Sequence, residues 1–80
     1  MVSGRQIAAA RALVGLSQAE LARNSNISVP TLKRMEASEG TASGLTNNVA
    51  AVRAALEGAG IIFIDQNGNG PGVRLRDRQA

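Results

Sequence analysis

The chain has 80 residues, a length that supports one small domain spanning 1–80, and 44% of them are apolar although Phe63 is the only aromatic residue. It contains no Cys or His, which excludes disulfides, thiol nucleophiles, imidazole bases and the usual zinc ligands. None of its carboxylates suggests an acid–base pair, so we expect no enzyme, no cofactor and no metal site. The net charge of +3 favours attraction to a polyanion.

Two short helices with clear start signals are predicted at the N-terminus. The first is capped by Ser3 and runs to about Val14, where Gly15 favours its end. Ser17 caps the second, and Glu20 three residues later completes a capping box. Each helix carries an apolar face at helical spacing, so we expect the two to pack together.

A third helix follows the polar turn at 24–26. Ser28 caps it, and Pro30 lies in its first turn, where a missing backbone N–H has no cost. Two residues form its buried stripe, and two basic residues face away from it: Leu32 and Met35, then Lys33 and Arg34. Two capped helices joined by a tight turn, the second with an exposed basic face, are the layout of a helix-turn-helix.

The second half of the chain changes from helical to extended periodicity. Residues 37–45 read as a loop, and Thr46 or Asn47 caps a fourth helix that ends near Gly58, so that the helical part covers about 3–58. The β-branched and aromatic run 61–64 and the alternating run 73–76 then predict a β-hairpin over about 61–76, with its turn at 65–72.

The hairpin has two open interpretations. In one, Ile62, Ile64 or their neighbours close the bottom of the helical core. In the other, its edge strand pairs with a second subunit, which favours a homodimer through the fourth helix and the hairpin. Arg74, Arg76 and Arg78 either contact phosphates or keep an exposed strand edge soluble.

Two apparent ligand motifs in the hairpin turn fail on inspection. Residues 65–70 match the opening of a calcium-binding EF-hand loop, but its twelfth position is Arg76 instead of Glu and its flanks are strands. The glycine-rich run 68–72 lacks the Lys, the Ser/Thr and the helix of a nucleotide phosphate loop. We therefore predict an ordinary turn.

Residues 5–57 resemble the Cro/repressor-type (XRE-like) helix-turn-helix family. The matching residues are Arg11, Leu16, Ser17, Gln18, Leu21, Ala22, Ile27, Ser28, Leu32, Met35 and Glu36. The resemblance implies a mainly α, lambda-repressor-like bundle of four helices, with the C-terminal hairpin in place of the fifth helix of many members. The family usually has Gly in the turn, where this chain has Asn26; Asn tolerates the left-handed conformation, so the difference is acceptable.

The resemblance also implies a DNA-contacting surface. The residues expected to contact DNA are Gln18, Ser28, Val29, Pro30, Thr31, Lys33 and Arg34. Arg34 is the best reader of a base, because guanidinium pairs bidentately with guanine, whereas Val29 and Pro30 offer only apolar contact to a thymine methyl. Gln18 lies at a helix N-terminus, where it can bind phosphate and brace the third helix. The competing interpretation of Lys33 and Arg34 is an ordinary solvated face.

One further pair is implied by the same resemblance. In the family, residues matching Arg11 and Glu36 form a partly buried ion pair that locks the first and third helices. We therefore expect a structural role for these two residues here, not a catalytic one.

The sequence predicts a DNA-binding transcriptional regulator, a dimeric repressor that inserts helix 28–36 into the major groove of double-stranded DNA. The alternative is an antitoxin or another protein-interaction module whose hairpin binds a partner protein. No apolar run approaches the roughly 18 residues of a membrane span, and no signal peptide is recognisable, so we expect a cytoplasmic protein with no membrane contact.

Overall fold

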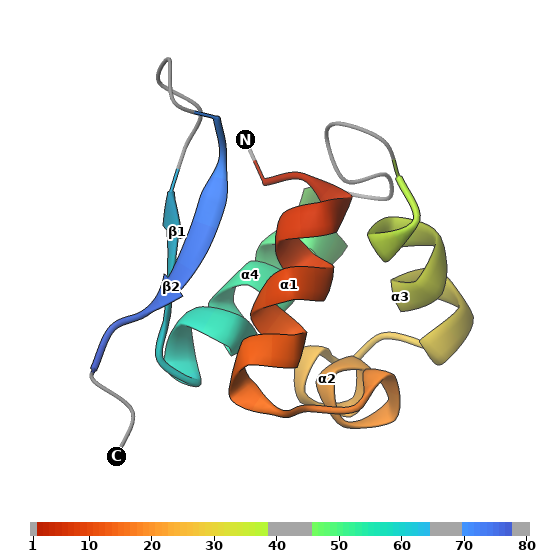
Figure 1. Ribbon diagram of the computed structural model, residues 1–80. Coiled ribbons are helices and arrows are strands. Elements are labelled where there is room, and N and C mark those ends of the chain that lie inside the picture. The colour runs from red at the N-terminus through yellow and green to blue at the C-terminus, as the bar shows by residue number, and fades with distance from the viewer. Residues whose placement is uncertain (1, 39–45, 65–69, 78–80) are drawn as a thin grey trace.

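The computed structural model describes residues 2–38, 46–64 and 70–77, and in it four helices are followed by an antiparallel hairpin (Figure 1). The elements are α1 (Gly4–Val14), α2 (Gln18–Ser25), α3 (Val29–Glu36), α4 (Thr46–Gly58), β1 (Ile61–Ile64) and β2 (Gly72–Leu75). The hairpin lies on the opposite side of α1 and α4 from α3 (Figure 1). The mainly helical fold predicted from the sequence is therefore confirmed.

The helix boundaries follow from local hydrogen bonds. Ser3, Ser17 and Ser28 cap α1, α2 and α3 as predicted, and each hydroxyl accepts a backbone N–H from three residues later. Gly15 ends α1 in the left-handed conformation, with φ of 75°. Thr46, one of the two predicted caps of α4, is instead its first helical residue.

The core is built from small aliphatic side chains supplied by all four helices. Its largest fully buried members are Ile7, Leu21, Leu32, Met35, Val52 and Leu56. These residues occur at helical spacing in the sequence, so each amphipathic helix buries one face against the others. The hairpin adds Ile61 and Phe63 to the same cluster.

The hairpin has the predicted pair of strands with two differences of detail. β2 begins at Gly72 and ends at Leu75, one residue earlier than predicted, and Ile61 pairs with Leu75. The core-facing residues of β1 are Ile61 and Phe63, whereas Ile64 is 37% exposed. Of the residues expected to close the core, which were Ile62, Ile64 or their neighbours, it is therefore the neighbours that do so. Alternate strand residues point to opposite faces, so facing Ile61 inward turns Ile64 outward.

Several sequence predictions concern residues that lie wholly or partly outside the described ranges. These are most of the loop at 37–45, most of the turn at 65–72, the comparison of 65–70 with a calcium loop, and the tail containing Arg78. Among the residues that the structure describes, no helix has both the length and the apolar character needed to cross a membrane.

Gln6 joins α1 to both strands of the hairpin. Its side chain is buried, and its Nε2 donates hydrogen bonds of 3.0 Å to the backbone carbonyls of Ile64 and Gly72. Its Oε1 accepts from the backbone N–H of Ser3 at 2.8 Å, which completes a capping box. The amide of Gln6 thus accepts a hydrogen bond at the start of α1 and donates two to the hairpin. Its two acceptors there belong to residues that lie opposite each other, Ile64 on β1 and Gly72 on β2.

We expect Gln6→Glu to lower the free energy of unfolding by about 2 kcal/mol, because the carboxylate cannot donate to the two carbonyls and is buried beside them. The acceptor for Ser3 N–H is kept, so the change isolates the contact with the hairpin. Urea denaturation measures the effect, with Arg5→Ala, an exposed neighbour in the same turn, as control. Equal stability of the two variants would contradict this role.

Candidate nucleic-acid interface

The second and third helices are joined by a three-residue turn. Asn26 ends α2 in the left-handed conformation, with φ of 58° and ψ of 42°, and its backbone N–H donates to carbonyls of the last turn of α2. Ile27 follows and packs against the core, and Ser28 caps α3. The expectation that Asn26 can replace the usual Gly is confirmed, since this conformation is the one that Asn adopts most readily after Gly.

The two faces of α3 have opposite character. Leu32 and Met35 are fully buried, whereas Pro30, Lys33 and Arg34 are exposed. Because a core side chain cannot turn outward without opening the core, the buried pair fixes which side of α3 faces solvent. The predicted basic face is therefore present at the surface.

Val29 departs from the expectation of a fully exposed first turn. It is half-buried and packs against the hydrophobic core, while its neighbours Ser28 and Pro30 are exposed. The burial follows from position, because Val29 lies three residues before Leu32 on the inward side of the helix. Pro30 is thus the more accessible of the two apolar residues.

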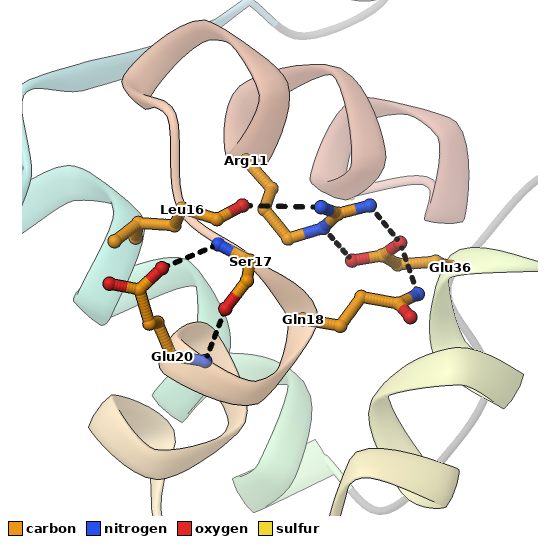
Figure 2. A network of polar contacts seen from close by, with 6 residues as sticks. All are labelled: Arg11, Leu16, Ser17, Gln18, Glu20 and Glu36. Atoms are coloured by element: carbon orange, nitrogen blue, oxygen red, sulfur yellow. Dashed lines mark hydrogen bonds and ion pairs between the residues drawn. The ribbon is translucent and has the colours of Figure 1, made fainter.

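Arg11 and Glu36 form a bidentate ion pair between α1 and α3 (Figure 2). The Nε of Arg11 donates to one carboxylate oxygen at 2.8 Å, and its Nη2 donates to the other at 3.1 Å. The carboxylate side chain is only 7% exposed. The hydrogen bond with Glu36 raises the pKa of Arg11 above its ordinary value, so the guanidinium stays charged.

Gln18 brings α2 to the same carboxylate. Its Nε2 donates to Glu36 at 3.1 Å, and the Nη1 of Arg11 reaches the carbonyl of Leu16 at 3.2 Å (Figure 2). Glu36 therefore accepts three hydrogen bonds, two from α1 and one from α2. The bracing contact expected of Gln18 is present, and the network holds the end of α3 against both preceding helices.

Gly4 is the site of a second close approach between α1 and the end of α3. A Cβ at this position would lie within 3.0 Å of three backbone carbonyl oxygens at the end of α3, those of Met35, Glu36 and Ser38. The start of α1 can approach these carbonyls only because residue 4 has no side chain. Two points along α1, at Gly4 and Arg11, therefore set the position of α3.

A protein-family model described as helix-turn-helix matches residues 7–46, which are half of the chain. The matched residues include all of α2 and α3. The chain belongs to the Cro/repressor-type (XRE-like) helix-turn-helix family. A search of curated proteins found no match.

Members of the helix-turn-helix family are DNA-binding regulators, so this chain is a DNA-binding helix-turn-helix regulator. The matched segment contains the whole carboxylate network and every residue expected to contact DNA. Gly4 and the hairpin lie outside it. The contacts of Gly4 with the end of α3 and of Gln6 with the hairpin carbonyls were not predicted, because each joins segments at least 31 residues apart in the chain, and no local pattern marks them.

The capping box of α2 contains an acid-sensitive contact. The backbone N–H of Ser17 donates to the Glu20 carboxylate at 2.9 Å (Figure 2). This hydrogen bond, followed by the Ser17 hydroxyl, lowers the pKa of Glu20 below its ordinary value. The charged carboxylate also lies in the first turn of α2, where the helix dipole favours a negative charge.

We expect the native protein to be more stable than Glu20→Gln near neutral pH, and this advantage to disappear in acid. A lowered pKa in the folded state means that the contribution is complete above the ordinary glutamate pKa and is lost as pH falls through the lowered value. Thermal unfolding of both proteins between about pH 6 and about pH 3 measures it. A difference in melting temperature that stays constant with pH would contradict the assignment.

Proposed function

We propose that the chain acts as a sequence-specific transcriptional repressor that places α3 in the DNA major groove. The supporting observation is the exposed face of α3, which presents Lys33 and Arg34 while Leu32 and Met35 are buried. In this binding mode Arg34 reads a guanine, and Lys33 contacts phosphates or base edges. Repression follows most simply from occlusion of the promoter by the bound protein.

The N-terminus of α2 supports the same orientation of the protein on DNA. Gln18 is the first residue of α2, where backbone N–H groups and the helix dipole favour an anion. Its Nε2 donates to Glu36 through one of its two N–H groups, so the other can donate to a DNA phosphate. A phosphate bound to Gln18 would then contact the same side chain that donates to Glu36 at the end of α3.

Fluorescence anisotropy with the DNA upstream of the gene and with a scrambled duplex, over a salt series, tests the proposal. We expect native DNA to be preferred, and Arg34→Ala to lose most of that preference, by about 1–3 kcal/mol. Lys33→Ala should weaken both duplexes and reduce the salt slope by about 1. Arg23→Ala, an exposed arginine on α2, is the control. Equal binding of both duplexes, unchanged in Arg34→Ala, would refute this mode.

We further propose that the regulator is a homodimer, because two copies of α3 about 34 Å apart can enter successive major grooves. The hairpin supports this arrangement, since it lies on the side of the molecule away from α3 and leaves the recognition helix accessible (Figure 1). Light scattering should give twice the chain mass of 8.2 kDa. A mass of one chain at micromolar concentration would contradict the dimer.

A protein-interaction role is the second candidate, and the outer face of the hairpin favours it. Ile64 is 37% exposed on this face, and Arg74, which pairs with Ile62 two residues earlier in the strand, is also exposed. An exposed apolar residue flanked by positive charge suits an acidic partner, as for an antitoxin that neutralises a toxin. A short toxin-like reading frame next to the gene would favour this function, and a solitary gene would favour the repressor alone.

A further inference from the structure

The cap of α3 and two residues of the helix form a continuous row of polar contacts. Ser28, Thr31 and Arg34 are each three residues apart, so they lie along one ridge of the helix. The hydroxyls of Ser28 and Thr31 are 2.8 Å apart, and the Nη2 of Arg34 donates to Thr31 Oγ1 at 3.4 Å. The row therefore runs from the cap of α3 to the guanidinium expected to read a base.

In the contact between Ser28 and Thr31 either hydroxyl can be the donor, and Thr31 Oγ1 can accept from Arg34 in both cases. Ser28 Oγ accepts the backbone N–H of Thr31 at 3.2 Å and, like any hydroxyl oxygen, can accept a second bond. When the Thr31 hydroxyl donates to Ser28, its lone pairs remain available to accept from Arg34. Each bond in such a chain polarises the next, so the cap strengthens the acceptor that Thr31 offers to the guanidinium.

This arrangement directs the guanidinium of Arg34 toward the N-terminal half of α3. The N-terminal residues of a recognition helix are those that approach base edges, so the guanidinium is held close to the DNA bases in the proposed mode. The contact uses Nη2, and guanine O6 and N7 are the acceptors that the guanidinium reaches in the proposed mode. The backbone carbonyl of Arg34 is itself held by Ser38 Oγ at 3.0 Å.

We propose that Thr31 is a positioning residue for sequence readout, whose hydroxyl holds the Arg34 guanidinium in the orientation that pairs with a guanine. This inference rests on the proposed function, because it requires Arg34 to be the base reader. This positioning role differs from direct contact between Thr31 and DNA, because Thr31 then affects the preference for guanine only through Arg34.

A double-mutant cycle separates these two roles. The proteins are the native chain, Thr31→Val, Arg34→Ala, the double variant and Thr31→Ser. Val matches Thr in shape and keeps the backbone N–H that caps onto Ser28, so only the hydroxyl is lost. The probes are the best duplex that the native protein selects from random DNA and a copy in which the guanine read by Arg34 is replaced.

We expect Thr31→Val to reduce the preference for the guanine duplex roughly five-fold, the effect of one hydrogen bond. In the Arg34→Ala background the same substitution should change nothing. Thr31→Ser should restore the preference, because its hydroxyl is kept. The melting temperature and the salt slope should match those of the native protein, since neither the core nor a phosphate contact changes.

An equal loss in both backgrounds would show that Thr31 acts without Arg34 and would overturn the inference while leaving the proposed function intact. A full preference in Thr31→Val would overturn it as well. If the native protein selects no sequence, or Arg34→Ala retains the guanine preference, the proposed function fails and the inference fails with it. The Arg34→Ala arm therefore distinguishes the two failures.

Discussion

Arg11→Ala is expected to lower the free energy of unfolding by about 3 kcal/mol, and the melting temperature by roughly 15 °C. The substitution leaves the Glu36 carboxylate, 7% exposed, with Gln18 as its remaining donor in the network. An uncompensated buried charge is costly because the protein interior solvates it poorly. The contact between Arg11 and the carbonyl of Leu16, which holds the link between α1 and α2, is lost as well.

Two controls make this result specific. Arg23→Ala removes an equal charge from an exposed site on α2 and should leave the melting temperature within about 2 °C of the native value. Replacing both partners, as Arg11→Met with Glu36→Leu, should recover part of the stability, because no charge is then left unpaired. If Arg11→Ala is no more destabilising than Arg23→Ala, the ion pair does not lock α1 to α3.

Gly4→Ala is expected to lower the free energy of unfolding by about 2 kcal/mol, the cost of adding atoms to a filled space. The new Cβ would lie 2.7 Å from the carbonyl oxygen of Ser38 and 3.0 Å from that of Glu36, and still closer to that of Met35. These are backbone atoms at the end of α3, so relief requires a shift of α3 itself. We therefore expect weaker DNA binding even at temperatures where the variant is folded.

Gly58→Ala is the matched control, because Gly58 ends α4 and a Cβ there meets nothing within 4 Å. Alanine should stabilise that helix by roughly 0.5–1 kcal/mol and leave DNA binding unchanged. Thermal unfolding together with anisotropy measurements on both variants tests the pair. Opposite signs in stability are the expected outcome; a neutral Gly4→Ala would mean that α3 does not depend on this close approach.

The first three helices begin where local sequence signals place them. Ser3, Ser17 and Ser28 were predicted as caps, and each is one, because a cap bonds to a residue only three positions away. The buried and exposed sides of α3 were predicted for a similar reason, since helical spacing alone separates Leu32 and Met35 from Lys33 and Arg34. The Arg11–Glu36 contact was anticipated only through the family resemblance.

Contacts between distant segments were decided by the tertiary structure. Gln6 binds carbonyls 58 and 66 residues away, and Gly4 meets the end of α3, so neither role has a local signal. The β-branched and aromatic run 61–64 and the alternating run 73–76 predicted the two strands, but not which residues of the first strand face inward, because a strand has two faces and packing against the helices selects one. Local hydrogen bonding and periodicity thus determined the elements from the sequence alone, whereas the placement of α3 between Gly4, Arg11 and Gln18 required the packed chain.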